Sequence, residues 1–149
     1  MKTFALGILV AAAVAFAIHA QAQQSPSPLP YAEGTVWEIS TVKVKSGFSE
    51  DYLRSMGATW KKVMEEAKKQ KLILSYKVLS SDASSREDWN IMLMIEYANM
   101  AALDGLEPKM RALALPTVGG EEGRKEFMTK RLEVREIVGS KLARELILK

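Results

Sequence analysis

Chemistry in this 149-residue sequence must come mainly from carboxylates, lysines, tyrosines, hydroxyls and tryptophans, because it has no cysteine and one histidine, His19. Glu38, Glu96 and Glu136 fall in segments that alternate like β-strands. Two of them could act as a paired acid and base if burial raised the pKa of one carboxyl. The alternative, which we favour, is that they pair with cations such as Lys77 across a sheet.

A second group of side chains predicts a ligand pocket. It consists of Trp37, Trp60, Met64, Tyr76 and Asn90. If the aromatic residues and the methionine meet between a helix and a sheet, they would form an apolar pocket with a few polar groups, which suits a flat apolar ligand. The alternative is that they fill an ordinary core, and that Asn90 is an ordinary strand residue.

The first 22 residues have the features of a secretory signal peptide. Lys2 precedes an apolar run from Phe4 to Ile18, and Ala20-Gln21-Ala22 offers a cleavage site with small residues. The run is shorter than the about 20 apolar residues that span a bilayer. We therefore expect cleavage, export to the periplasm or the medium, and no stable membrane insertion of the mature chain. Cleavage would also remove His19.

The mature chain would then contain neither histidine nor cysteine, which excludes several classes of site. These are zinc sites and haem attachment built on such residues, Ser-His-Asp or Cys-His catalysis, and disulfides. We expect no metal and no cofactor. With 21 Lys and Arg against 18 Asp and Glu, the net charge is +3, so we expect no nucleic-acid partner, which would need a concentrated basic face.

Turn residues and alternating patterns predict the strands that would position these side chains. Three prolines between Ser25 and Pro30 predict an extended linker over residues 23–34, followed by one domain over 35–149. β-Branched and alternating residues predict strands at 35–45, 72–79, 88–97 and 132–138. After Gly139, residues 141–148 fit a strand or a short helix, of which we favour the strand.

Apolar residues three and four positions apart predict the helices. A long helix is expected from Ser49 to Lys69, with Ser49 as its N-cap. A second helix should follow Asn99 and be short or bent, because Gly105 and Pro108 fall inside it. One or two further helical turns are expected around residues 124–130.

The second and third strands should form a hairpin, and its pairing decides which side chains share a face. We expect Lys77 opposite Asn90, which puts Tyr76 on one face with Ile95. The other face would then mix apolar and charged side chains: Val42, Ile73, Met92, Met94 and Ile137 with Glu38, Lys77, Glu96 and Arg135. Such a mixed face predicts an interaction surface, most simply a two-fold homodimer in which the sheets face each other.

The order strand, helix, strand, strand, helix, strand predicts an α+β fold of the ferredoxin-like split βαβ type, with helices on one face of an antiparallel sheet. Val44-Lys45-Ser46-Gly47-Phe48 joins the first strand to the long helix. Through this junction the sequence resembles the dimeric α+β barrel superfamily, which includes antibiotic-biosynthesis-monooxygenase-like proteins, over about residues 35–138. Residues 86–89 and 131–136 resemble an exported bacterial subgroup of unassigned function. The resemblance implies a homodimer with a ligand cavity between helix and sheet.

Together these observations give a functional hypothesis: an exported, homodimeric, non-catalytic domain that binds a small apolar molecule or has a structural role. The resemblance also implies an alternative, a cofactor-independent oxygenase or isomerase with Trp60, Tyr76 and Asn90 in its pocket. A third hypothesis is a protein-interaction module that docks through Leu142–Leu148.

Overall fold

Residues 28–149 are described by a computed structural model of the chain. The predicted signal peptide, residues 1–22, and the first part of the predicted linker, residues 23–27, lie outside the described residues. Within residues 28–149 no helix has the length and apolar character needed to cross a membrane.

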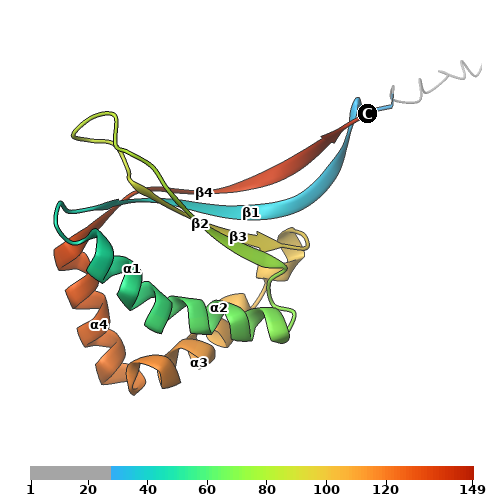
Figure 1. Ribbon diagram of the computed structural model, residues 1–149. Helices are drawn as coiled ribbons and strands as arrows, with labels where there is room; N and C mark the ends of the chain where they lie inside the picture. Colours follow the sequence, from blue (N-terminus) through green and yellow to red (C-terminus); the bar gives the residue numbers. More distant parts are fainter. Residues whose placement is uncertain (1–27) are drawn as a thin grey trace, which may run out of the picture.

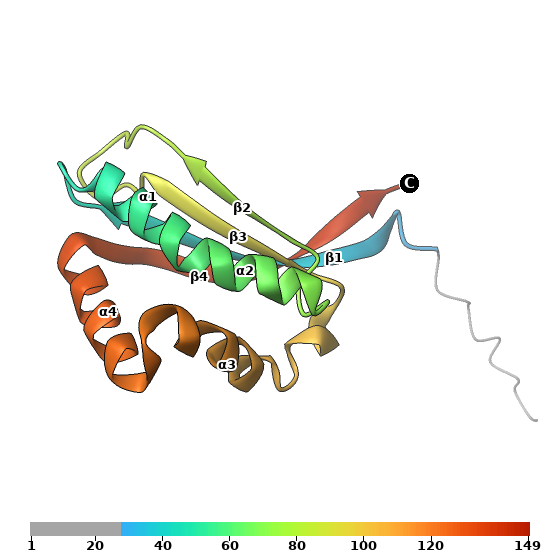
Figure 2. The ribbon, with the colours of Figure 1, turned by 60° about the horizontal axis from the view of Figure 1, so that its bottom comes forward.

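Four antiparallel strands form the sheet, in the order β2-β3-β1-β4. They are β1 (Tyr31–Val44), β2 (Ser75–Ser80), β3 (Ile91–Tyr97) and β4 (Arg135–Leu148). The helices lie on one face of this sheet, as Figures 1 and 2 show. The predicted ferredoxin-like α+β arrangement is confirmed.

The predicted long helix is present but is interrupted at Thr59. It consists of α1 (Ser49–Ala58) and α2 (Trp60–Lys69). The Thr59 hydroxyl donates a 2.8 Å hydrogen bond to the carbonyl of Ser55, four residues earlier, and bonds of this kind bend helices. The prediction that Ser49 is the N-cap is wrong, because Phe48 occupies that position.

The second helical region bends where predicted. A 3₁₀ turn, η1 (Met100–Leu103), ends before Gly105, whose φ of 63° starts α3 (Leu106–Val118). The Asn99 side chain accepts a 3.1 Å bond from the Ala102 N–H. Pro108 lies in the first turn of α3. Backbone N–H groups in this turn have no partner within the helix, so a proline, which has no N–H, is tolerated there.

The last helix is longer than predicted. Gly119, with a φ of 82°, separates α3 from α4 (Gly120–Val134). Gly120, the first residue of α4, has a φ of 84°. The prediction of a strand from residue 132 is therefore wrong by three residues. Leu132 and Val134 fit the alternating pattern of a strand, but both residues belong to α4, and the strand begins at Arg135.

Strand β4 is continuous across Gly139, which pairs with Thr41, so the prediction that Gly139 ends a strand is wrong. The C-terminal segment is a strand, as favoured. Its end pairs with residues 31–33, which were predicted as linker, and Tyr31 lies opposite Leu148. The β1–β4 ribbon therefore projects beyond the helices (Figure 1).

The hairpin of β2 and β3 is confirmed, with a different register. Lys77 pairs with Met94 instead of Asn90. The shift from 90 to 94 is an even number of residues, so it preserves the faces. Tyr76 lies opposite Ile95, as the predicted face assignment requires.

The core lies between the sheet and the helices, in two clusters that both contact Trp60. One consists of Val36, Val63, Met64, Ala67, Ile73, Tyr97 and Leu106; the other of Val42, Val44, Tyr52, Met56, Ile91 and Leu93. Val42, Ile73 and Arg135 were predicted on the open face but are buried on the helix side. Glu38 is also on the helix side, where it accepts a 2.8 Å bond from Tyr97. The prediction of the faces was wrong because Trp37 and Ile39 on the open face are as apolar as Val36 and Val42 on the helix side.

The open face of the sheet carries apolar and charged side chains together, although its members differ from those predicted. The residues of β1 and β3 that point away from the helices include Trp37, Ile39, Met92, Met94 and Glu96. The ammonium group of Lys77 lies 5.1 Å from the centre of the Trp37 ring.

Candidate functional site

A pocket of about 180 Å³ lies where α2, α3 and α4 meet, and we call it the helix pocket. It is lined by Thr59, Trp60, Val63, Ala114, Thr117, Val118, Arg124, Phe127, Met128 and Arg131. Most of these side chains are apolar, and the arginines provide the charge. The pocket is therefore suited to an apolar body with a polar group at its rim.

A second recess, of about 190 Å³, lies beside the helix pocket between α1 and α4, and we call it the α1 recess. It is lined by Phe48, Asp51, Tyr52, Ser55, Phe127, Lys130, Arg131 and Val134. Phe127 and Arg131 line both spaces. Because they are four residues apart on α4, they lie on one side of that helix.

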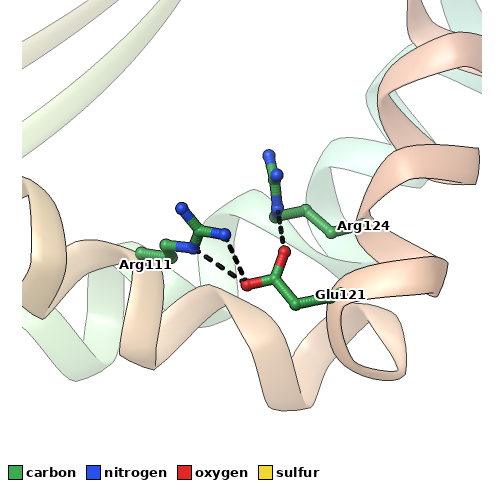
Figure 3. A network of polar contacts seen from close by, with 3 residues as sticks. All are labelled: Arg111, Glu121 and Arg124. Atoms are coloured by element: carbon green, nitrogen blue, oxygen red, sulfur yellow. Dashed lines mark hydrogen bonds and ion pairs between the residues drawn. The ribbon is translucent and has the colours of Figure 1, made fainter.

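A polar network fixes α4 against α3, as Figure 3 shows. Arg111 of α3 donates to one carboxylate oxygen of Glu121 through Nε and Nη2, at 2.9 and 2.7 Å. Arg124 donates through Nε to the other oxygen at 3.0 Å. These hydrogen bonds, first from Arg111 and then from Arg124, lower the pKa of Glu121. Arg124 therefore enters the helix pocket already paired with a carboxylate.

Arg131 differs from the other cations that line the two spaces. Lys130 pairs with Glu126 at 2.7 Å, and Arg124 pairs with Glu121. None of the ion pairs formed within residues 28–149 includes Arg131. Its guanidinium lies 5.2 Å from the centre of the Phe127 ring.

Arg135, one helical turn beyond Arg131, is only 9% exposed. Its Nη1 donates a 2.7 Å hydrogen bond to the Tyr52 hydroxyl oxygen. Its Nε is buried and has no hydrogen-bond partner in the described part of the chain. Burial, followed by the positive charge of Arg135, lowers the pKa of Arg131. Both guanidinium groups lie beside the Tyr52 ring, that of Arg131 at 6.0 Å and that of Arg135 at 5.6 Å from its centre.

Three of the five predicted site residues come together in the core, and of these Trp60 also lines the helix pocket. Trp60 and Tyr76 meet edge to face, with ring centres 5.1 Å apart and planes at 88°. Met64 is buried in the same cluster. The Tyr76 hydroxyl donates a 2.5 Å bond to Glu65. Burial, followed by this bond, raises the pKa of Tyr76 to about 12.

Trp37 and Asn90 lie elsewhere. Trp37 follows Val36, which points into the helix-side core, so its ring lies on the open face. The Asn90 amide bonds to the backbone of Val44: Oδ1 accepts from the N–H at 2.8 Å and Nδ2 donates to the carbonyl at 2.9 Å. The amide therefore extends the pairing of β1 and β3.

The glutamates considered for acid and base chemistry are separated. Glu38 is on the helix side and accepts from Tyr97. Glu96 is on the opposite face, where it accepts from Thr35 at 2.9 Å and from Ser75 at 2.5 Å. No group of three or more histidine, aspartate or glutamate side chains within residues 28–149 is placed to hold a metal ion.

The sequence patterns did not single out Tyr52, Phe127 and Arg131, which line the two spaces, or the buried Arg135 beside Tyr52. A signal was present for two of them, because Phe127 and Arg131 are four residues apart, which is the repeat of one helix face. It was missed because the end of this segment was interpreted as a strand. The contact between Tyr52 and Arg135 spans 83 positions of the chain and has no local signal.

Neither a family model nor a curated protein matches this chain. The solved structures that are similar to it include the following three proteins. HapK from Hahella chejuensis has a TM-score of 0.45 and 10% identity, over 74% of this chain and 91% of that one. A NIPSNAP family protein of unknown function from Agrobacterium tumefaciens has a TM-score of 0.47 and 12% identity, over 78% and 90%.

The third similar structure is a dimeric protein of unknown function and ferredoxin-like fold from Bacteroides fragilis. It has a TM-score of 0.39 and 17% identity, over 78% of this chain and 97% of that one. By its own strand order and by the placement of its helices on one face, the present chain is an α+β protein with a ferredoxin-like fold.

Proposed function

We propose that this protein binds a small molecule with an apolar body in the helix pocket. The observation that carries the proposal is the lining, in which Trp60, Val63, Ala114 and Phe127 converge from three helices. At about 180 Å³ the pocket is smaller than the about 300–1,000 Å³ of sites for drug-sized ligands. The ligand body is therefore the size of a single ring or a short alkyl chain.

We further propose a binding role without catalysis. A general acid or base works best with a pKa near the operating pH, whereas the pKa of Tyr76 is raised to about 12. Glu38 and Glu96 point to opposite faces of the sheet. The raised pKa of Tyr76 and the separation of Glu38 from Glu96 support a binding protein over the oxygenase or isomerase alternative.

Binding can be tested by NMR titration with two acids, phenylacetate and octanoate, and their amides. We expect at least one compound to shift the backbone amide signals of α2, α3 and α4. Ala114→Leu should abolish these shifts, because Ala114 lines the pocket. The matched control is Ala112→Leu, the same change at an exposed position of α3, which should preserve them. Binding that survives Ala114→Leu would place the ligand elsewhere.

We also propose that the mature protein is exported and forms a homodimer through the open face of the sheet. The motivating features are the leader over residues 1–22 and the apolar side chains of that face. Ile39 and Met94 lie directly opposite each other on β1 and β3. Because the helix pocket is on the other side of the sheet, such a dimer would leave it open.

Ile39→Glu should convert the proposed dimer into a monomer, because it would bury an unpaired charge of each copy in the contact face. Sedimentation velocity of the mature protein measures the change. Leu53→Glu is the matched control, since Leu53 is 43% exposed on α1, and it should leave the dimer intact. A wild-type protein that sediments as a monomer at micromolar concentration would refute the dimer.

A further inference from the structure

We infer that the ligand carries a carboxylate, which binds between the Arg131 guanidinium and the Tyr52 hydroxyl, while its apolar body lies in the helix pocket. This inference rests on the proposed function, because it defines the chemical class of the same ligand. Tyr52 of α1 and Arg131 of α4 would recognise the negative charge of the ligand. An apolar ligand alone would not need these two polar groups.

Within residues 28–149, no ion pair compensates the positive charge of Arg131. A guanidinium removed from water is costly unless an anion accompanies it. Arg131 is half-buried, and neither it nor Arg135 belongs to an ion pair within residues 28–149. A bound anion would supply the missing partner.

The Tyr52 hydroxyl accepts a hydrogen bond and still has its own proton to donate. Its oxygen accepts from Nη1 of Arg135 at 2.7 Å, so a cation polarises it from the buried side. A hydroxyl carries one proton to donate, and no acceptor for that proton is found among the hydrogen bonds of residues 28–149. Tyr52 and Arg131 both line the α1 recess. The recess thus offers an anion a guanidinium and a hydroxyl donor.

The other charged residues that line the two spaces either oppose an anion or already have a partner. Asp51 lines the α1 recess and opposes an anion, whereas Lys130 is paired with Glu126. Arg124 is paired with Glu121 at the other end of the helix pocket. The cation left for a ligand is therefore Arg131, at the boundary of the two spaces. Its planar guanidinium matches the two oxygens of a carboxylate.

The test compares each acid with its own amide by NMR titration of the wild-type protein. We expect phenylacetate or octanoate to bind at least about tenfold more tightly than the matching amide, since hydrogen bonds to charged groups are the stronger kind. Arg131→Met should bring the acid to the affinity of the amide. Arg54→Met is the control, because Arg54 is exposed on α1 and lines neither space, and it should preserve the tenfold preference.

Tyr52→Phe provides a second variant, which retains the ring and removes the hydroxyl. It should reduce the affinity for the acid several-fold and leave the affinity for the amide unchanged. Equal affinities of acid and amide for the wild-type protein would overturn the inference and leave the proposed apolar pocket in place. Failure of all four compounds to bind would overturn the proposed function and, with it, this inference.

Discussion

Replacement of Met64 by alanine is expected to lower the free energy of unfolding by about 2–5 kcal/mol. Met64 is 3% exposed and belongs to the cluster that contains Val36 and Ala67. Shortening its side chain removes apolar contacts and leaves a cavity, because neighbours from both the sheet and the helices hold their positions.

Met100→Ala is the matched control for this substitution. Met100 is 47% exposed in η1, so its replacement should change the free energy of unfolding by no more than about 0.5 kcal/mol. Urea unfolding followed by circular dichroism measures both variants. Equal small effects would mean that Met64 is a replaceable pocket wall, as one sequence-based interpretation allows, instead of a core residue.

Asn90→Ala is expected to lower the free energy of unfolding by roughly 2–4 kcal/mol. The substitution leaves the N–H and carbonyl of Val44 without their side-chain partners, and each unpaired buried backbone group costs about 1–3 kcal/mol. Val44 is itself buried, so water does not readily replace the lost bonds. The edge of the β1–β3 pairing should loosen.

The control for Asn90 is Asn99→Ala. Asn99 makes one exposed bond to the Ala102 N–H, at the start of η1, and losing such a cap costs about 1 kcal/mol. Thermal unfolding of both variants gives the comparison, and NMR titration with octanoate gives the ligand affinity. An Asn90→Ala variant that kept its stability but lost octanoate binding would contradict the structural role and support a place for Asn90 in the site.

Local signals were enough to predict the fold. β-Branched runs marked the positions of the strands, and Gly105 marked the bend before α3. The alternative of a C-terminal helix was harder to exclude, because Leu142 and Leu146 fit either periodicity. Pairing with β1 decides in favour of a strand, and that pairing involves residues more than a hundred positions away.

The candidate site was only partly predictable, because it depends on contacts between distant segments. Trp60, Met64 and Tyr76 were found through spacing and type, and they do come together. The face of Trp37 depended on whether β1 buries its even or odd positions, and both sets contain apolar and polar residues. The position of Arg135 beside Tyr52 depended on where α4 ends.

The two ends of the domain meet at the tip of the β1–β4 ribbon, where the Lys149 N–H donates a 3.0 Å hydrogen bond to the Pro30 carbonyl. This tip projects away from the helices (Figure 2). An affinity tag or a surface tether attached at Lys149 would therefore hold the protein by the ribbon. Immobilised in this way, the molecule would keep its helices, and the helix pocket between them, away from the point of attachment.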